Sequence, residues 1–135
     1  MCNYHLIIID VQEKLIPVMS GNKDLINNLK KLVEGFNLYQ LPIIVSEQVP
    51  DKLGNTIKDI KSLLNGHCTV FKKSEFSCMN SKSFNEKLNT INLNSKLILC
   101  GIETHICVFQ TAKDLIASNY NVEIVTDCIS SRKKN

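Results

Sequence analysis

The chain has 135 residues, of which 44% are hydrophobic, and this suits one globular domain over residues 1–135 that needs no metal or disulfide to hold its core. Its formal charge of +3 comes from 16 lysines and arginines spread along the sequence, and only Arg132, Lys133 and Lys134 form a basic cluster. Such a distribution is typical of a solvated surface, so we expect no nucleic-acid partner.

The cysteines and the N-terminal segment indicate the cellular compartment in which the protein is expected. Cys100 and Cys128 lie in or beside apolar runs, and the six cysteines form no CxxC pair, which favours reduced thiols in the cytosol. The first apolar run has four residues and ends at Asp10, too short for a signal-peptide core or a membrane span. We therefore expect a cytoplasmic protein with no membrane partner.

Five short apolar runs rich in β-branched residues alternate with helical or polar segments along the chain. They predict strands at residues 5–10, 42–47, 67–73, 96–101 and 121–127. Runs such as LIII and LIL are apolar at consecutive positions, which indicates strands buried on both faces. The alternation predicts an α/β fold, a three-layer α/β/α sandwich around a doubly wound parallel sheet with right-handed crossovers.

The segments between the strands carry helical periodicity. An amphipathic stripe runs from Leu25 to Phe36 and predicts a helix that ends near Tyr39. A second stripe predicts a helix over residues 105–118. Residues 80–90 carry a narrower apolar face, and residues 55–65 indicate a shorter helix.

Ligands of open parallel sheets bind at the carboxyl ends of the strands, which here are marked by Asp10, Glu47, Lys73, Gly101 and Asp127. Among the residues at this edge, Asp10 and Lys73 supply a carboxylate and an amine, with Lys72 as the competing lysine. The helix after the fourth strand adds the thiol of Cys107. These three residue types form a set typical of nucleophilic catalysis.

Cys107 is expected in the first turn of that helix, with Thr104 as its N-cap. Unpaired N–H groups and the helix dipole would stabilise a thiolate there and could also donate to an oxyanion. The alternative is that Cys107 is a small buried hydrophobic residue. His105 is expected on the surface or the pocket rim, because residues two apart on a helix do not face each other. His5 and His67 are expected at the opposite end of the sheet, with His5 paired locally.

Four motifs resemble the isochorismatase-like cysteine hydrolases: LIIIDVQEKL, IIVSEQVPDKLGNT, FKKSEFSC and LILCGIETHICVFQTAKDL running to IVTDCISSR. They span nearly the whole chain in the family's order. The resemblance implies a catalytic triad of Asp10, Lys73 and Cys107, and it selects Lys73 over Lys72. It also implies a non-proline cis peptide between Ile102 and Glu103, with oxyanion donors at the backbone N–H groups of Glu103 and Cys107.

The sequence departs from the family in two places. Relatives usually extend well beyond the SSR motif, so we expect a C-terminally shortened fold: either the chain is a truncated product, or the sheet is one strand short. We expect the apolar surface or sheet edge left exposed to be covered by self-association into a homo-oligomer. Nicotinamidases carry metal-binding histidines after the second strand, where this chain reads SEQVPDKLG. We therefore expect no metal and no other cofactor.

The resulting hypothesis is a cysteine-dependent hydrolase that cleaves amide-type C–N bonds of a small-molecule substrate through a thioester. Isochorismatases that cleave a vinyl ether lack the nucleophilic cysteine, so Cys107 argues against that reaction. The alternative function is a catalytically inactive isochorismatase-like interaction or scaffold domain. A nucleotide-binding Rossmann domain has less support, because the five glycines form no GxGxxG pattern.

Overall fold

The centre of the fold is one parallel sheet of five strands in the order β3-β2-β1-β4-β5. The computed structural model describes residues 3–132, so Lys133 and Lys134 of the basic cluster lie outside the described residues. The strands are β1 (Tyr4–Ile9), β2 (Ile43–Gln48), β3 (Cys68–Lys73), β4 (Lys96–Ile102) and β5 (Asn121–Ser130). The predicted doubly wound parallel sheet is confirmed, with β1 at the point where the strand order reverses.

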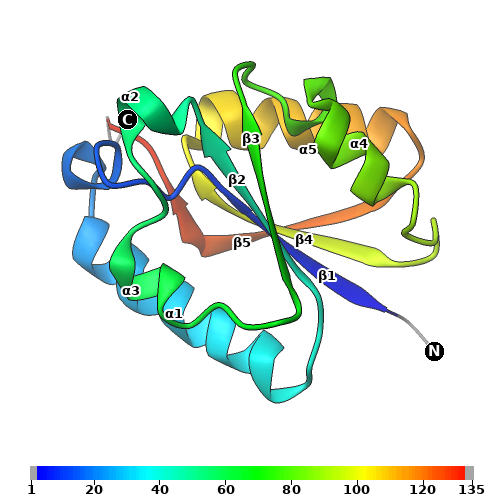
Figure 1. The fold of residues 1–135 in the computed structure, drawn as a ribbon, viewed down its shortest axis with the longest axis horizontal. Coiled ribbons are helices and arrows are strands. Elements are labelled where there is room, and N and C mark those ends of the chain that lie inside the picture. Colours follow the sequence, from blue (N-terminus) through cyan, green and yellow to red (C-terminus); the bar gives the residue numbers. More distant parts are fainter. Residues whose placement is uncertain (1–2, 133–135) are drawn as a thin grey trace.

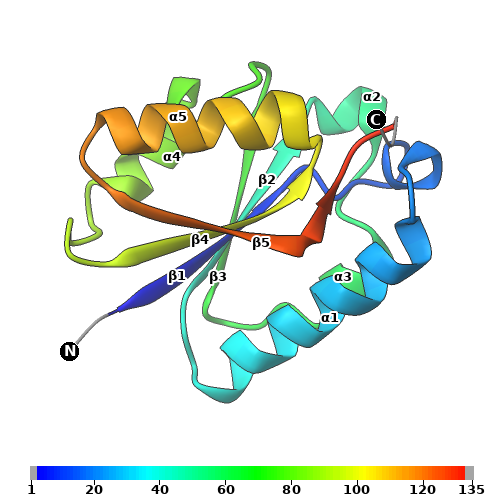
Figure 2. The same ribbon diagram turned by 180° about the vertical axis from the view of Figure 1, so that it is seen from behind.

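Helices cover both faces of the sheet (Figure 1). One face carries α1 (Asn22–Leu38) and the short α3 (Lys58–Lys61), and the other carries α4 (Lys82–Leu88) and α5 (Phe109–Ala117). The view from behind shows the same three layers, with α5 running along β5 (Figure 2). None of the helices within residues 3–132 has the length and apolar character needed to cross a membrane.

Two hydrophobic clusters fill the space between the layers. On β1, Leu6 and Ile8 belong to the cluster under α1, whereas Ile7 and Ile9 belong to the cluster under α4 and α5. Successive side chains of a strand point to opposite faces, so β1 contributes to both clusters, and these four side chains are 0% exposed. Each buried side chain of this size contributes about 1.5–3 kcal/mol to folding, which explains why the central strand is apolar at consecutive positions.

The turns and short helices differ from the sequence prediction. The helix predicted over 55–65 is only one turn, and an unpredicted short helix, α2 (Pro50–Leu53), follows β2. Pro50 occupies the first turn of α2 and Gly54 ends it with a φ of +83°, so local backbone preferences account for both of its ends. Two 3-10 turns lie at Ile16–Val18 and Cys78–Asn80.

Gly101 is required where β4 passes β1. Its φ is +116°, and a Cβ at this position would meet the backbone of Ile9, with the Ile9 nitrogen at 2.7 Å. Any side chain here would push β4 away from β1 or distort the turn that follows. The close approach therefore fixes the position of the segment after β4, which carries Cys107.

Candidate active site

Asp10 follows the carboxyl end of β1, at the reversal point of the strand order where ligands of open α/β sheets bind. The residue is 1% exposed, and its φ of +55° is uncommon for a residue other than glycine. Conformations of this kind persist only where the surrounding structure enforces them, and they cluster at functional sites. The backbone conformation thus places the Asp10 carboxylate at the carboxyl end of the sheet, where a ligand would bind.

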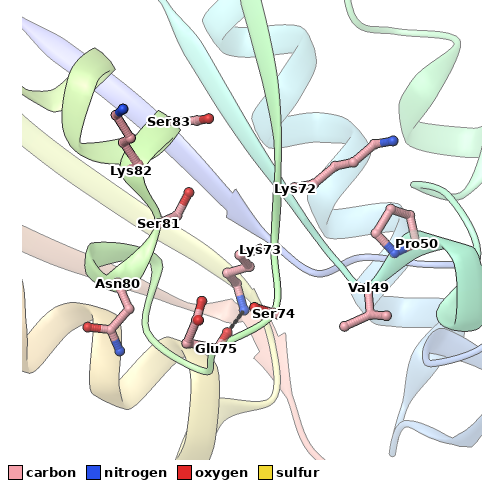
Figure 3. A pocket seen from close by; sticks show the side chains of 10 residues that line it. All are labelled: Val49, Pro50, Lys72, Lys73, Ser74, Glu75, Asn80, Ser81, Lys82 and Ser83. Carbon is pink, nitrogen blue, oxygen red and sulfur yellow. Dashed lines mark hydrogen bonds between the residues drawn. The ribbon is translucent and has the colours of Figure 1, made fainter.

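Lys73 reaches Asp10 from the edge strand of the sheet. Its Nζ lies 2.9 Å from Asp10 Oδ2, and its side chain is 0% exposed. It also donates to the backbone oxygens of Glu75 at 2.9 Å and Phe76 at 3.0 Å. Lys72 is exposed and leaves β3 on the opposite side (Figure 3). Of the two candidate lysines, Lys73 is therefore the one that contacts Asp10.

Cys107 completes the cluster from the segment after β4. The residue is 7% exposed, and its Sγ lies 3.6 Å from Lys73 Nζ. The Asp10 carboxylate also lies near enough to this thiol to raise its pKa. The structure thus brings together Asp10, Lys73 and Cys107 from three elements that are far apart in the sequence.

The turn that carries Cys107 differs from the predicted helix start. Residues Thr104–Val108 form a π-helical turn before α5, with Val108 N–H donating to the Glu103 oxygen at 3.2 Å. Thr104 is not its N-cap: the Thr104 N–H donates to Ser131 Oγ at 3.1 Å. The capping oxygen therefore comes from the residue after β5, which no local sequence pattern indicates.

The electrostatics of the site disfavour a thiolate at rest. The pKa of Cys107 is raised to about 12, first by burial and then by the nearby Asp10 carboxylate, while Lys73 acts to lower it. This is opposite to the predicted stabilisation of a thiolate by a helix N-terminus. Burial also raises the pKa of Asp10, against the opposing effect of Lys73. A carboxylate with a raised pKa is a stronger base, which suits it to accept the thiol proton during attack.

Strand β2 supplies two site residues that the sequence analysis missed. Ser46 Oγ donates to Asp10 Oδ1 at 2.7 Å, and Gln48 Oε1 accepts hydrogen bonds from Lys73 Nζ at 2.6 Å and Cys107 Sγ at 3.3 Å. Both are polar residues at alternate positions near the carboxyl end of a buried strand. That period of two was the signal that could have identified them.

Two residues that the sequence analysis placed at this edge of the sheet, Glu47 and Asp127, do not join the cluster. Glu47 points to the other face of β2, where its Oε2 accepts from the Thr56 N–H at 2.7 Å and the Thr56 hydroxyl at 2.8 Å. Asp127 is exposed and lies within β5, which continues to Ser130. Alternation along β2 explains why Glu47 faces away from the cluster, and the greater length of β5 explains why Asp127 does not end its strand.

The histidines stay outside the cluster. His105 is exposed, and its Nδ1 lies 3.0 Å from Ser131 Oγ. His5 Nδ1 is buried and has no hydrogen-bond partner within residues 3–132, so the expected local pairing is wrong. Burial, followed by the charge of Lys87, lowers the pKa of His5.

The peptide bond between Ile102 and Glu103 is cis. The Glu103 N–H donates to no acceptor in the part of the chain that the structure describes. The Glu103 carboxylate lies 3.5 Å from Arg132 Nε and accepts from the Arg132 N–H at 3.3 Å. A backbone donor without a partner therefore lies four residues before the thiol.

An open pocket of about 430 Å³ lies beside Lys73 (Figure 3). Its lining is formed by Val49, Pro50 and residues 72–75 and 80–83, and Cys107 is not among them. Across residues 3–132, no three side chains of His, Cys, Asp or Glu are grouped so that they could hold a metal ion. Independence from metals remains a prediction.

The sequence of the chain is similar to that of a known protein family. The sequence profile of the isochorismatase domain matches residues 4–135. Isochorismatase domain-containing protein 1 of Salmo salar is 37% identical, over 91% of this chain and 42% of that protein. The secreted isochorismatase effector Isc1 of Phytophthora sojae is 31% identical, over 93% of this chain and 61% of that protein. The chain thus spans about two fifths to three fifths of the length of these relatives.

A solved structure of similar fold is that of MAR1 ribonuclease from Caenorhabditis elegans. Its TM-score is 0.89 at 33% sequence identity, with 98% of this chain and 67% of that chain covered. The similarity therefore extends over the whole sheet and both helical layers described here.

Proposed function

We propose that this chain, which belongs to the isochorismatase domain family, is a hydrolase of small amide-type C–N bonds that acts through a thioester on Cys107. One observation carries the proposal: Lys73 Nζ lies 2.9 Å from Asp10 Oδ2 and 3.6 Å from Cys107 Sγ. A buried acid, a buried lysine and a thiol in contact at the reversal point of the sheet support nucleophilic catalysis.

The proposed reaction begins with transfer of the Cys107 proton to Asp10 as sulfur attacks the substrate carbonyl. The backbone N–H groups of Glu103 and Cys107 donate to the oxyanion, and Lys73 keeps Asp10 in place. The amine then leaves with the proton from Asp10, and a thioester remains. Water attacks this thioester while Asp10 takes one of its protons. The C–S bond breaks to release the acid, and Asp10 returns the proton to the Cys107 sulfur, which restores the thiol.

The compartment and the assembly of the protein are also proposed. Five cysteines, Cys68, Cys78, Cys100, Cys107 and Cys128, are free, and this supports a reducing compartment such as the cytoplasm. One relative carries the description of a secreted effector, so the compartment has to be measured for this chain. We further propose that the protein is a homo-oligomer that acts on a small molecule without a metal or other cofactor.

The second candidate function is an inactive interaction or scaffold domain. The observation that favours it is the environment of Cys107, whose thiol is buried and has a pKa raised to about 12. Buried structural cysteines are inert for the same reason. A direct measurement of turnover separates the two candidates.

The test is ammonia release from a panel of small amides and ureides by the wild-type protein and by Cys107→Ser. Loss of a nucleophile costs several orders of magnitude, so we expect Cys107→Ser to lose at least about 10³-fold in rate. Cys68→Ser, at the other end of the sheet, is the matched control and should retain the wild-type rate.

Intact-mass spectrometry after rapid acid quench should detect the acyl-enzyme on the wild-type chain and not on Cys107→Ser. Ammonia release that survives Cys107→Ser would refute the proposed chemistry. A folded wild-type protein that releases no ammonia from any member of the panel would favour the scaffold function.

A further inference from the structure

Gln48, the last residue of β2, contacts both the lysine and the thiol of the proposed site. Its Oε1 lies 2.6 Å from Lys73 Nζ and 3.3 Å from Cys107 Sγ. The register of the sheet pairs Gln48 with Lys73, so the carboxamide lies between the edge strand and the turn that carries the thiol. Gln48 is half-buried, and it has no part in the reaction proposed for Asp10, Lys73 and Cys107.

The chemistry of Lys73 fixes which end of the carboxamide faces it. An ammonium group has only donors, so the atom that it contacts at 2.6 Å must be the oxygen of Gln48. The same oxygen is then the acceptor for the thiol of Cys107. Gln48 therefore presents a neutral acceptor to a thiol whose pKa is raised by the nearby Asp10 carboxylate.

The backbone of Gln48 is anchored on both sides. Gln12 is 0% exposed; its Oε1 accepts from the Gln48 N–H at 2.7 Å, and its Nε2 donates to the Gln48 oxygen at 2.9 Å. The next residue, Val49, has a φ of +37°, which is rare for a β-branched side chain, and its N–H donates to the Lys73 oxygen at 2.8 Å. The carboxamide thus projects from a fixed backbone.

We propose that Gln48 is a positioning residue that holds the Cys107 thiol in its protonated resting form. The thiol donates its one proton to the Gln48 carboxamide, and the Asp10 carboxylate nearby is the base of the proposed reaction. A carboxamide is not a base, so a hydrogen bond to Gln48 keeps the proton on sulfur, whereas a hydrogen bond to Asp10 is the route for its transfer. The inference rests on the proposed function in taking Cys107 as the nucleophile.

Titratable groups from three segments lie near this thiol or share its hydrophobic cluster. Asp10 follows β1, Lys73 ends β3, and Cys78 lies in the turn after β3, where Lys73 and Asp10 both affect its pKa. Glu75 contacts Lys73 through its backbone oxygen, which accepts a hydrogen bond from Lys73 Nζ. Because Lys73 has three other oxygen acceptors besides Gln48, loss of the Gln48 oxygen should leave the ammonium in place.

The test is the rate at which iodoacetamide alkylates Cys107, followed by peptide mass spectrometry in Gln48→Met and Gln48→Glu. Below the thiol pKa this rate is proportional to the thiolate fraction. Gln48→Met keeps the shape and removes the acceptor that stabilises the thiol, so alkylation at about pH 8 should become about tenfold faster, equivalent to a pKa lower by about one unit. Gln48→Glu places a negative charge beside the sulfur, so alkylation should become about tenfold slower.

The matched controls are Gln40→Met and Gln40→Glu, at an exposed glutamine after α1, and both should alkylate at the wild-type rate. Thermal melting checks that each variant is folded. If Gln48→Met does not fold, Gln48→Asn withdraws the oxygen by one methylene and should also accelerate alkylation. A structural role alone would change both Gln48 variants in the same direction.

Opposite changes in Gln48→Met and Gln48→Glu support the inference, even if the wild-type protein hydrolyses no amide and the proposed function fails. Changes in the same direction, or rates within about twofold of wild type in both variants, overturn it. If the protein hydrolyses amides but the Gln48 variants give either of these results, the proposed function stands and the positioning role of Gln48 does not.

Discussion

Cys107 and Asp10 share a buried environment that raises the pKa of both side chains. Burial is the largest cause that raises the pKa of each, and the lysine between them acts against it in both cases. An exposed cysteine near a helix N-terminus would form a thiolate more readily. The buried cluster instead keeps the proton on sulfur and provides a carboxylate that can take it. Reactivity in the proposed mechanism thus arises during attack and not in the resting protein.

Asp10→Asn should separate the reactivity of the thiol from turnover. The charge of Asp10 raises the pKa of Cys107, so its loss lowers that pKa, and alkylation of Cys107 at a fixed pH should become faster. Amide hydrolysis should fall by at least about 100-fold, because the proton acceptor is gone. Asp127→Asn, at an exposed aspartate on β5, should change neither measurement. Slower alkylation together with retained turnover in Asp10→Asn would remove Asp10 from the role of base.

At the scale of the element, the strands were predictable because their signal is local. Apolar, β-branched runs located all five strands, and the residues ending two of them, Asp10 and Lys73, meet in the structure. The π-helical turn was not predictable, since its N-terminal acceptor is Ser131, on a segment 27 residues away from Thr104. Gln48 was missed for a similar reason: its contacts depend on how β2 and β3 pair and on where the turn after β4 lies.

Gly101→Ala should destabilise the fold at the end of β4. The substitution forces a side chain into a φ of +116° and against the backbone of Ile9, so we expect a loss of about 3 kcal/mol or more in the free energy of unfolding. Gly35→Ala is the matched control in α1, where an added Cβ meets nothing within 4 Å, and it should stabilise by about 0.5–1 kcal/mol. Chemical denaturation measures both. A Gly101→Ala variant as stable as wild type would show that β4 can move away from β1.

At the scale of the whole molecule, β3 and β5 form the two edges of the sheet. Phe109 and Ile116 on α5 are 58% and 59% exposed, and Ile124 on β5 is 40% exposed. The register pairs Ile124 with Leu99, which belongs to the same cluster as Leu115 of α5, so Ile124 lies on the α5 side of the sheet. Large apolar side chains thus remain exposed on one side of the molecule, next to an edge strand.

This surface is the basis for predicting self-association. Exposed apolar side chains beside a strand edge favour contact with another copy. Burying the part of Ile116 and Ile124 that is still exposed contributes roughly half of the ~1.5–3 kcal/mol that full burial of each side chain contributes. The double variant Ile116→Lys and Ile124→Lys should therefore weaken association by at least about tenfold, measured by sedimentation across a range of protein concentrations. Leu38→Lys is the matched control, because Leu38 is 78% exposed at the end of α1, on the other face of the sheet. A wild-type protein that stays monomeric at tens of micromolar, or a double variant that associates as tightly as wild type, would contradict the prediction.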